Sequence, residues 1–167
     1  ENALRLYDRC ADVHAGRGGI LFVQQRFAEA EREYETALAL GPVMEATHLF
    51  YAALCAWKKD CNKALWAVLR AKELAGSPLS QTYACEILML RNLGRLDEAL
   101  AVSRQALKLF PDGFDIIINH ANVCRLLGLR EELAAALKRI LELQPDFTAE
   151  RPRPAFSMKR SRPGTWR

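Results

Sequence analysis

The chain has 167 residues, of which 50% are hydrophobic and 26% are charged. This is ordinary globular composition, and it excludes a chain that is disordered throughout. The longest apolar run lies around Phe50–Trp57 and is far shorter than the roughly 20 apolar residues of a membrane-spanning helix, so we expect no membrane segment. The formal net charge of +4 comes from 24 Lys and Arg against 20 Asp and Glu.

Helical periodicity runs through most of the chain. Apolar residues recur at steps of three and four, as in Ala30, Tyr34 and Ala37, and this spacing places them on one face of an amphipathic helix. Pro42, Pro111 and Pro145 follow such segments and would end each helix, because proline cannot continue the hydrogen-bond ladder. The predicted helices, in chain order, cover about residues 3–24, 27–40, 45–58, 61–74, 80–92, 96–109, 113–127 and 130–143.

Small residues recur at a nearly constant interval in every second predicted helix. The first set is Ala30, Ala64 and Ala99, with Leu133 at the matching position of the last repeat. A parallel set follows two helical turns further on, at Ala37, Ala71, Ala106 and Ile140. Small side chains let two helix backbones approach closely where they cross. A pair of helices cannot bury its apolar face alone, so repeated pairs are expected to stack into a solenoid.

The repeated segments resemble the tetratricopeptide repeat (TPR) family, whose unit of about 34 residues is an antiparallel helix pair. The resemblance covers about residues 11–145 and implies an all-α fold, a right-handed α-solenoid of antiparallel helix pairs. It places a solenoid over residues 1–146, followed by a tail over residues 147–167. Within the solenoid the repeats are predicted at about 11–44, 45–78, 80–113 and 114–147.

Residues that could carry catalysis or hold a metal are sparse. His14, His48 and His120 fall in three different predicted helices, and no catalytic or phosphate-binding motif occurs in the sequence. We therefore expect no enzyme activity and no cofactor. His48 and Cys55 share a helix face and could seat a metal, but the Leu, Phe and Trp residues around them favour a packed core pair.

The five cysteines are odd in number and include no CxxC pair. This pattern fits neither a zinc site nor a disulfide scaffold. We expect reduced thiols that serve as small hydrophobic residues in a cytoplasmic protein, with no metal bound.

The family resemblance implies that the first helix of each pair lines a concave groove that binds a partner protein or peptide. Large aromatic side chains would anchor the partner, amides would bond its backbone and arginines would meet a carboxylate. The candidate residues are Phe50, Trp57, Arg91, Asn92, Asn119, Asn122 and Arg125. The alternative for the aromatic residues is that they only fill a tight superhelix. In repeat one the matching positions are glycine-rich: Asp12, Ala15, Gly16, Gly19, Phe22 and Val23.

Two other functions remain open at this stage. The chain begins at Glu1 rather than Met, which is consistent with the regulatory or targeting region of a larger enzyme. Residues 143–151 resemble the end of TPR arrays appended to bacterial signalling enzymes such as class III adenylate cyclases. The other possibility is a self-association module, and the sequence does not determine the oligomeric state.

The tail differs in charge from the rest of the chain. The segment from Arg151 to Arg167 contains six Lys and Arg and no acid, so residues 1–150 carry 18 bases against 20 acids. The net positive charge of the whole chain therefore comes from its tail. It is poor evidence for nucleic-acid binding by the solenoid. We expect the tail to be extended, and its aromatic residues could also cap the last repeat.

Overall fold

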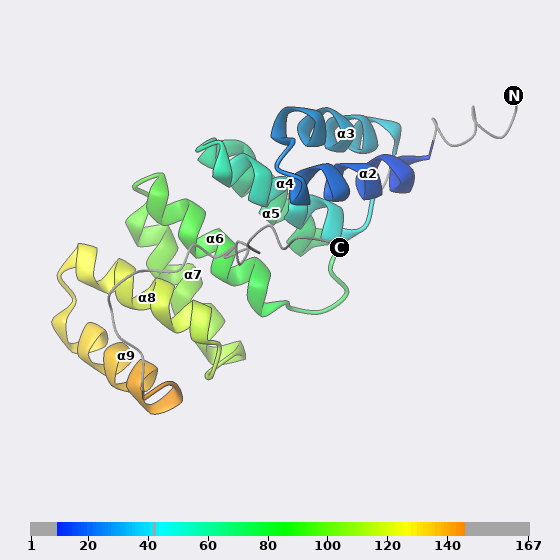
Figure 1. The fold of residues 1–167 in the computed structure, drawn as a ribbon. Helices are drawn as coiled ribbons and strands as arrows, with labels where there is room; N and C mark the ends of the chain where they lie inside the picture. The colour runs from blue at the N-terminus through cyan, green and yellow to red at the C-terminus, as the bar shows by residue number, and fades with distance from the viewer. Residues whose placement is uncertain (1–9, 42, 146–167) are drawn as a thin grey trace, which may run out of the picture.

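The computed structural model describes residues 10–41 and 43–145, and these residues are helical apart from short connections (Figure 1). In chain order the helices are α2 (Ala11–Val23), α3 (Phe27–Leu40), α4 (Glu45–Trp57), α5 (Cys61–Leu74), α6 (Ser80–Asn92), α7 (Leu96–Leu109), α8 (Phe114–Leu127) and α9 (Arg130–Leu143).

The helices predicted from sequence match these bounds to within one residue except at the start of the first. That helix was predicted from about residue 3, whereas α2 begins at Ala11. Cys10 explains the difference, because its backbone is extended with φ −98° and ψ 113°. Such a conformation flanks a helix and does not continue it. The rest of the predicted extension lies outside the described residues.

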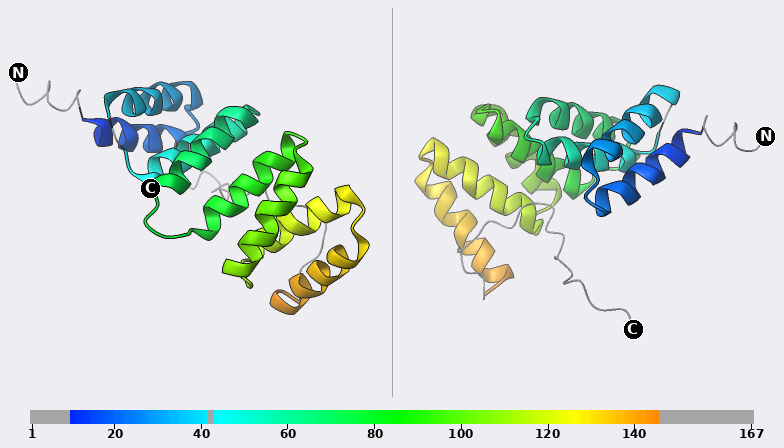
Figure 2. Two further views of the ribbon diagram at one scale, coloured as in Figure 1. Left: turned by 180° about the vertical axis from the view of Figure 1, so that it is seen from behind. Right: turned by 45° about the horizontal axis from the view of Figure 1, so that its top comes forward.

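Consecutive helices pack as antiparallel pairs: α2 with α3, α4 with α5, α6 with α7, and α8 with α9 (Figure 1). Neighbouring pairs are joined by contacts between α5 and α6, between α7 and α8 and, less extensively, between α3 and α4. The pairs follow one another in a row, with α2 and α3 at one end and α9 at the other (Figure 2). The first helices α6 and α8 also pack against each other, and α2 touches α4, so these two pairs of first helices lie side by side.

The recurring small residues lie at the helix crossings. The alanines at the six recurring positions have no exposed surface: Ala30, Ala37, Ala64, Ala71, Ala99 and Ala106. A larger side chain at these positions would push the packed backbones apart, because protein interiors have little free volume. In the last repeat, Ile140 of α9 is buried, whereas Leu133 is only partly so.

The turn inside each helix pair uses a residue with a left-handed backbone. Gly94 and Gly128 have φ of 75° and 73°. In the first two repeats the same turn position is occupied by Gln25 and Lys59, with φ of 62° and 65°. Glycine adopts this conformation without a steric penalty, whereas other L-residues do not. The turn geometry is therefore common to all four repeats even where the residue is not glycine.

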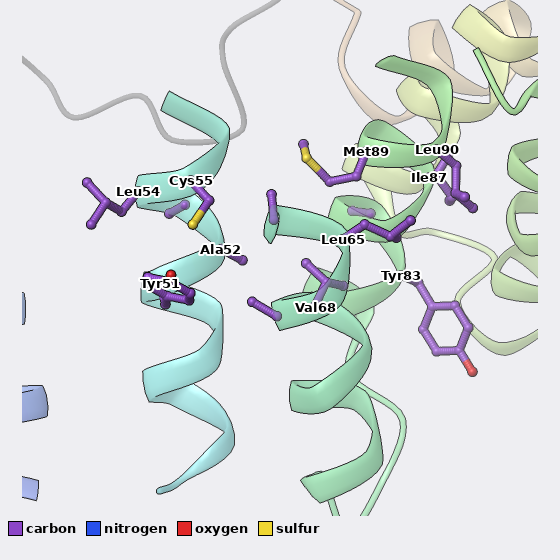
Figure 3. Close-up of a cluster of buried hydrophobic side chains, with 14 of the residues drawn as sticks. Tyr51, Ala52, Leu54, Cys55, Leu65, Val68, Tyr83, Ile87, Met89 and Leu90 are labelled. Atoms are coloured by element: carbon purple, nitrogen blue, oxygen red, sulfur yellow. The ribbon is translucent and has the colours of Figure 1, made fainter. Parts of the chain in front are cut away.

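Most of the buried side chains form one continuous core from α2 to α8. Figure 3 shows its central part, where Leu65 and Val68 of α5 lie between side chains of α4 and side chains of α6. A smaller cluster of Ile117, Ala121, Ala136 and Ile140 joins α8 to α9. The last helix therefore rests on a smaller apolar contact than the helices inside the array.

Candidate functional site

The first helices of the repeats leave an apolar pocket at the N-terminal end of the solenoid. It has a volume of about 630 Å³ and lies between α2 and α4. Twelve residues line it: Asp12, Ala15, Gly16, Gly19, Ile20, Phe22, Val23, Gln24, Met44, Ala46, Thr47 and Phe50. All six positions that the family resemblance assigns to the groove in repeat one are among them. Its size lies in the range of about 300–1,000 Å³ that is usual for ligand pockets.

Glycines on α2 keep this pocket open. A Cβ atom added at Gly16 would meet nothing within 4 Å, and one added at Gly19 would meet only the Tyr34 hydroxyl, at 3.7 Å. The large side chains around the glycines are unusually exposed for apolar residues, at 61% for Ile20, 64% for Val23 and 64% for Met44. Clustered exposed apolar residues of this kind mark interaction surfaces more often than isolated ones do.

The two candidate aromatic residues of α4 have different surroundings. Phe50 lines the pocket and is 46% exposed. Trp57 does not line it, and its ring stacks on Phe27 of α3, with centroids 3.8 Å apart and an interplanar angle of 28°. One face of the indole is therefore covered by the protein itself, although the residue remains 60% exposed.

A second hollow, of about 420 Å³, lies between α6 and α8. It is lined by Ser80, Gln81, Ala84, Cys85, Gly113, Phe114, Asp115 and Ile116, and so it is more polar than the first. Burial raises the pKa of the Cys85 thiol to about 11. The thiol is therefore neutral at physiological pH and a poor nucleophile.

The candidate polar residues of the last two repeats bond to one another and to the backbone. Asn119 is buried, and its Nδ2 donates to the carbonyl oxygens of Asp115 at 2.9 Å and Ala84 at 3.4 Å. Its Oδ1 accepts from Arg91 Nη1 at 3.5 Å. The Asn119 amide thus ties α8 to α6, and in this arrangement it is already used inside the protein.

The remaining polar candidates surround this network. Arg91 Nη2 donates to Asn92 Oδ1 at 3.4 Å, and Asn122 Nδ2 donates to the Ile118 carbonyl at 3.0 Å. Burial, followed by the charge of Arg125, lowers the pKa of Arg91. Arg125 is exposed. None of these residues lines either of the two hollows.

The pocket also includes residues that sequence reasoning did not select. Ile20 and Met44 are outside the groove positions that the family resemblance assigns. A local signal in the sequence could have identified them. Ile20 directly follows Gly19 and Met44 directly precedes α4, so both large apolar side chains would lie exposed beside the glycine-lined pocket.

The pair His48 and Cys55 behaves as the packed pair that the sequence favours. The His48 ring meets Trp66 edge to face, with centroids 5.8 Å apart. Burial and the nearby Arg70 lower the pKa of His48, so the ring is neutral at physiological pH. Burial also raises the pKa of Cys55, to about 11. Both residues are buried in α4.

Comparison with known proteins shows which of them share this architecture. A family model described as "Tetratricopeptide repeat" matches residues 88–112. The structure of YrrB, a TPR protein with an unusual peptide-binding site, is similar with a TM-score of 0.75 and 25% identity, over 87% of this chain and 78% of that one. The chain has the fold of a TPR superhelix.

Other TPR structures agree with this fold. MamA gives a TM-score of 0.77 at 15% identity, over 86% of this chain and 84% of that one. PilF of Pseudomonas aeruginosa gives 0.70 at 16% identity, over 80% and 61%. A search of curated protein sequences finds no significant match. Among the described residues, every helix is too short or too polar to span a lipid bilayer.

The comparisons lend no support to the adenylate cyclase resemblance at residues 143–151. Most of that junction, like the basic tail, lies outside the described residues.

Proposed function

We propose that this TPR chain is a non-catalytic scaffold that holds a peptide segment of a partner protein in the pocket between α2 and α4. The observation that carries this proposal is the apolar lining of that pocket, where Ile20, Val23, Met44 and Phe50 are all exposed. Leaving such side chains in water is unfavourable, by about 25 cal/mol for each Å² of apolar surface that a ligand could cover. A partner that buries them therefore binds with a hydrophobic driving force.

The chemistry of the lining defines the partner segment. Its contact side chains are apolar, and they enter between α2 and α4 where Gly16 and Gly19 leave space. At the rim, the carboxylate of Asp12 can accept and the amide of Gln24 can both donate and accept. A short extended or helical segment with two or three apolar anchors and one basic residue matches this surface. The peptide-binding site of YrrB supports the same class of ligand.

The proposed site lies nearer the N-terminus than most of the groove residues expected from sequence. Of the seven groove residues proposed from sequence, Phe50 is the one that lines the pocket. The polar set at α6 and α8 would contribute only if the segment continued along the groove, and Asn119 would first have to release the hydrogen bonds that it makes inside the protein.

The test is a selection from a displayed peptide library on the intact chain, followed by affinity measurements on the selected peptides by fluorescence anisotropy. Replacing Val23 or Met44 by Ser should weaken binding about tenfold or more, since each is a large exposed apolar residue of the pocket lining. Leu137→Ser and Leu141→Ser are matched controls, because both residues are similarly exposed apolar residues on α9. These controls should leave the affinity within about twofold.

Two results would contradict the proposal. In one, the affinity of selected peptides survives the Val23 and Met44 changes and falls when residues 147–167 are deleted, which would move binding to the tail. In the other, no peptide is selected, and light scattering over a concentration series shows an oligomer that the Val23 change disrupts. That result would favour self-association through the pocket.

A further inference from the structure

Three side chains with metal-binding atoms meet where α8 packs against the start of α9. His120 and Cys124 lie one helical turn apart on α8, and Glu132 lies in the first turn of α9. Cys124 Sγ is 3.4 Å from His120 Nε2, and Nε2 is 3.7 Å from Glu132 Oε2. One possible ligand atom from each of the three residues lies within 4.8 Å of the other two. His120 and Cys124 are buried, and Glu132 is half-buried, so the cluster opens to solvent at its Glu132 side.

The hydrogen bonds of Ser103 determine which nitrogen of His120 carries the proton. The Ser103 hydroxyl lies 2.9 Å from the Leu100 carbonyl oxygen and 2.8 Å from His120 Nδ1. A carbonyl oxygen can only accept, so the hydroxyl proton points to Leu100, and Ser103 Oγ accepts from Nδ1–H. The lone pair of the neutral ring is therefore on Nε2, the nitrogen that faces Cys124 and Glu132. A hydrogen bond of this kind behind a ligand histidine is the usual arrangement in metal sites.

We propose that His120 Nε2, Cys124 Sγ and a carboxylate oxygen of Glu132 form a zinc site, with the fourth position open to water. Zinc favours this mixture of sulfur, nitrogen and oxygen ligands in tetrahedral geometry. With ordinary zinc–ligand bond lengths, a tetrahedral site separates the sulfur from the nitrogen by about 3.5 Å and the nitrogen from the oxygen by about 3.3 Å. The observed separations are 3.4 Å and 3.7 Å, and the sulfur and the carboxylate oxygen lie within 4.8 Å of each other, so binding would draw Glu132 toward Cys124.

Arg104 of α7 is the competing cation at this site. Its Nε and Nη2 lie 3.1 Å and 2.5 Å from the two oxygens of Glu132. Its side chain is 52% exposed, so it can leave Glu132 for water at modest cost. The group formed by a zinc ion, one thiolate and one carboxylate has no net charge. The positive charge of the zinc ion would take the place of the Arg104 charge beside Glu132.

The position of the site shows which helices a bound metal would connect. It links α8 to α9, whose apolar contact is the smaller of the two core clusters, and Ser103 connects it to α7. A metal held there would attach the last helix to the rest of the solenoid. Because a ligand that binds only the folded state stabilises it, zinc should raise the unfolding midpoint of the protein.

The experiment uses the intact chain, purified in reductant with chelator and then freed of both. Co²⁺ is added as a spectroscopic probe for thiolate coordination, and Zn²⁺ is used to displace it. We expect one equivalent of Co²⁺ to give a sulfur-to-metal charge-transfer band, and Zn²⁺ to abolish the band and raise the melting temperature. Cys124→Ser and His120→Gln should each weaken binding by roughly 100-fold, because each removes a direct ligand.

Matched variants separate this site from the other thiols and from loss of folding. Cys55→Ser, at a buried thiol of α4, should leave Co²⁺ affinity within about twofold. Glu132→Gln removes the third ligand at a half-exposed position and should weaken binding, whereas Arg104→Gln removes the competitor and should strengthen it. The absence of a charge-transfer band in the wild type, or a band that persists in folded Cys124→Ser, would overturn the proposal.

Discussion

Gly18 of α2 lies directly against the aromatic ring of Tyr34 in α3. A Cβ atom on Gly18 would be 2.9 Å from Tyr34 Cε1 and 3.0 Å from Cδ1. Tyr34 is fully buried, so its ring cannot move toward solvent to make room. The glycine in the middle of a helix is thus explained by close packing between the two helices of the first repeat.

This contact predicts opposite effects for two glycine substitutions on the same helix. Gly16→Ala should stabilise the protein by about 0.5–1 kcal/mol, because alanine is the better helix former and its Cβ meets nothing. Gly18→Ala should instead destabilise it by about 1–3 kcal/mol, because overpacking against Tyr34 outweighs the gain in helix propensity. Urea unfolding followed by circular dichroism measures both. Equal changes of the same sign would show that helix propensity alone decides the outcome.

The left-handed turn positions predict a second pair of opposite effects. Lys59 is exposed and has φ of 65°, so Lys59→Gly should stabilise the protein by about 1 kcal/mol through relief of backbone strain. Gly94 has φ of 75°, and an added Cβ would meet no atom within 4 Å. Gly94→Ala should therefore destabilise by about 1 kcal/mol for backbone reasons alone. Thermal and urea unfolding of the two variants should shift in opposite directions, and a loss of stability in Lys59→Gly would contradict the turn geometry.

The close helix crossing in the third repeat predicts that a larger side chain at Ala99 destabilises the protein, whereas a change at the neighbouring Glu98 has little effect on stability. Ala99 has no exposed surface, so Ala99→Leu should cost about 1–3 kcal/mol through overpacking. Glu98 is exposed and pairs with Arg95 at 2.6 Å, and Glu98→Ala should cost well under about 1 kcal/mol. Similar urea midpoints for the two variants would mean that Ala99 is not at a crossing.

The buried histidine of α4 predicts a loss of stability in mild acid. Burial and Arg70 lower the pKa of His48 below the ordinary value of 6.5, so the unfolded chain takes up the proton at a higher pH than the folded protein does. The contribution to stability is complete above about pH 6.5 and declines as the pH falls toward the folded-state pKa. We expect the urea midpoint to drop between about pH 7 and pH 5.5, before most carboxylates titrate.

His48→Gln removes this titration and serves as the comparison. Its unfolding midpoint should change less over the same interval than that of the wild type. The measurement should be made with chelator present, so that any metal at His120 does not add its own pH dependence. Parallel curves for the two proteins would show that other groups cause the acid sensitivity.

The sequence alone determined the helices and their repeat. Helix limits depend on local chemistry, so the apolar spacing, as at Ala30 and Ala37, and the prolines were enough to place seven of the eight helices of the described chain to within one residue. The start of the first was wrong, because nothing in the sequence marks the extended backbone at Cys10. The regular interval between small residues indicated close helix crossings, and the full burial of the alanines at the six recurring positions agrees with this.

Only the tertiary structure decided which of the predicted groove residues remain available. Asn119 and Phe50 both fall at groove positions by spacing, yet the first is engaged by α6 and the second lines an open pocket. The spacing of His120 and Cys124 was readable from sequence, whereas the third group, Glu132, comes from the next helix, and Ser103 from the one before. Periodicity assigns a residue to a face of its own helix. The neighbouring helices determine whether that face is covered, bonded or open, because burial and hydrogen bonding are set by contacts between segments distant in sequence.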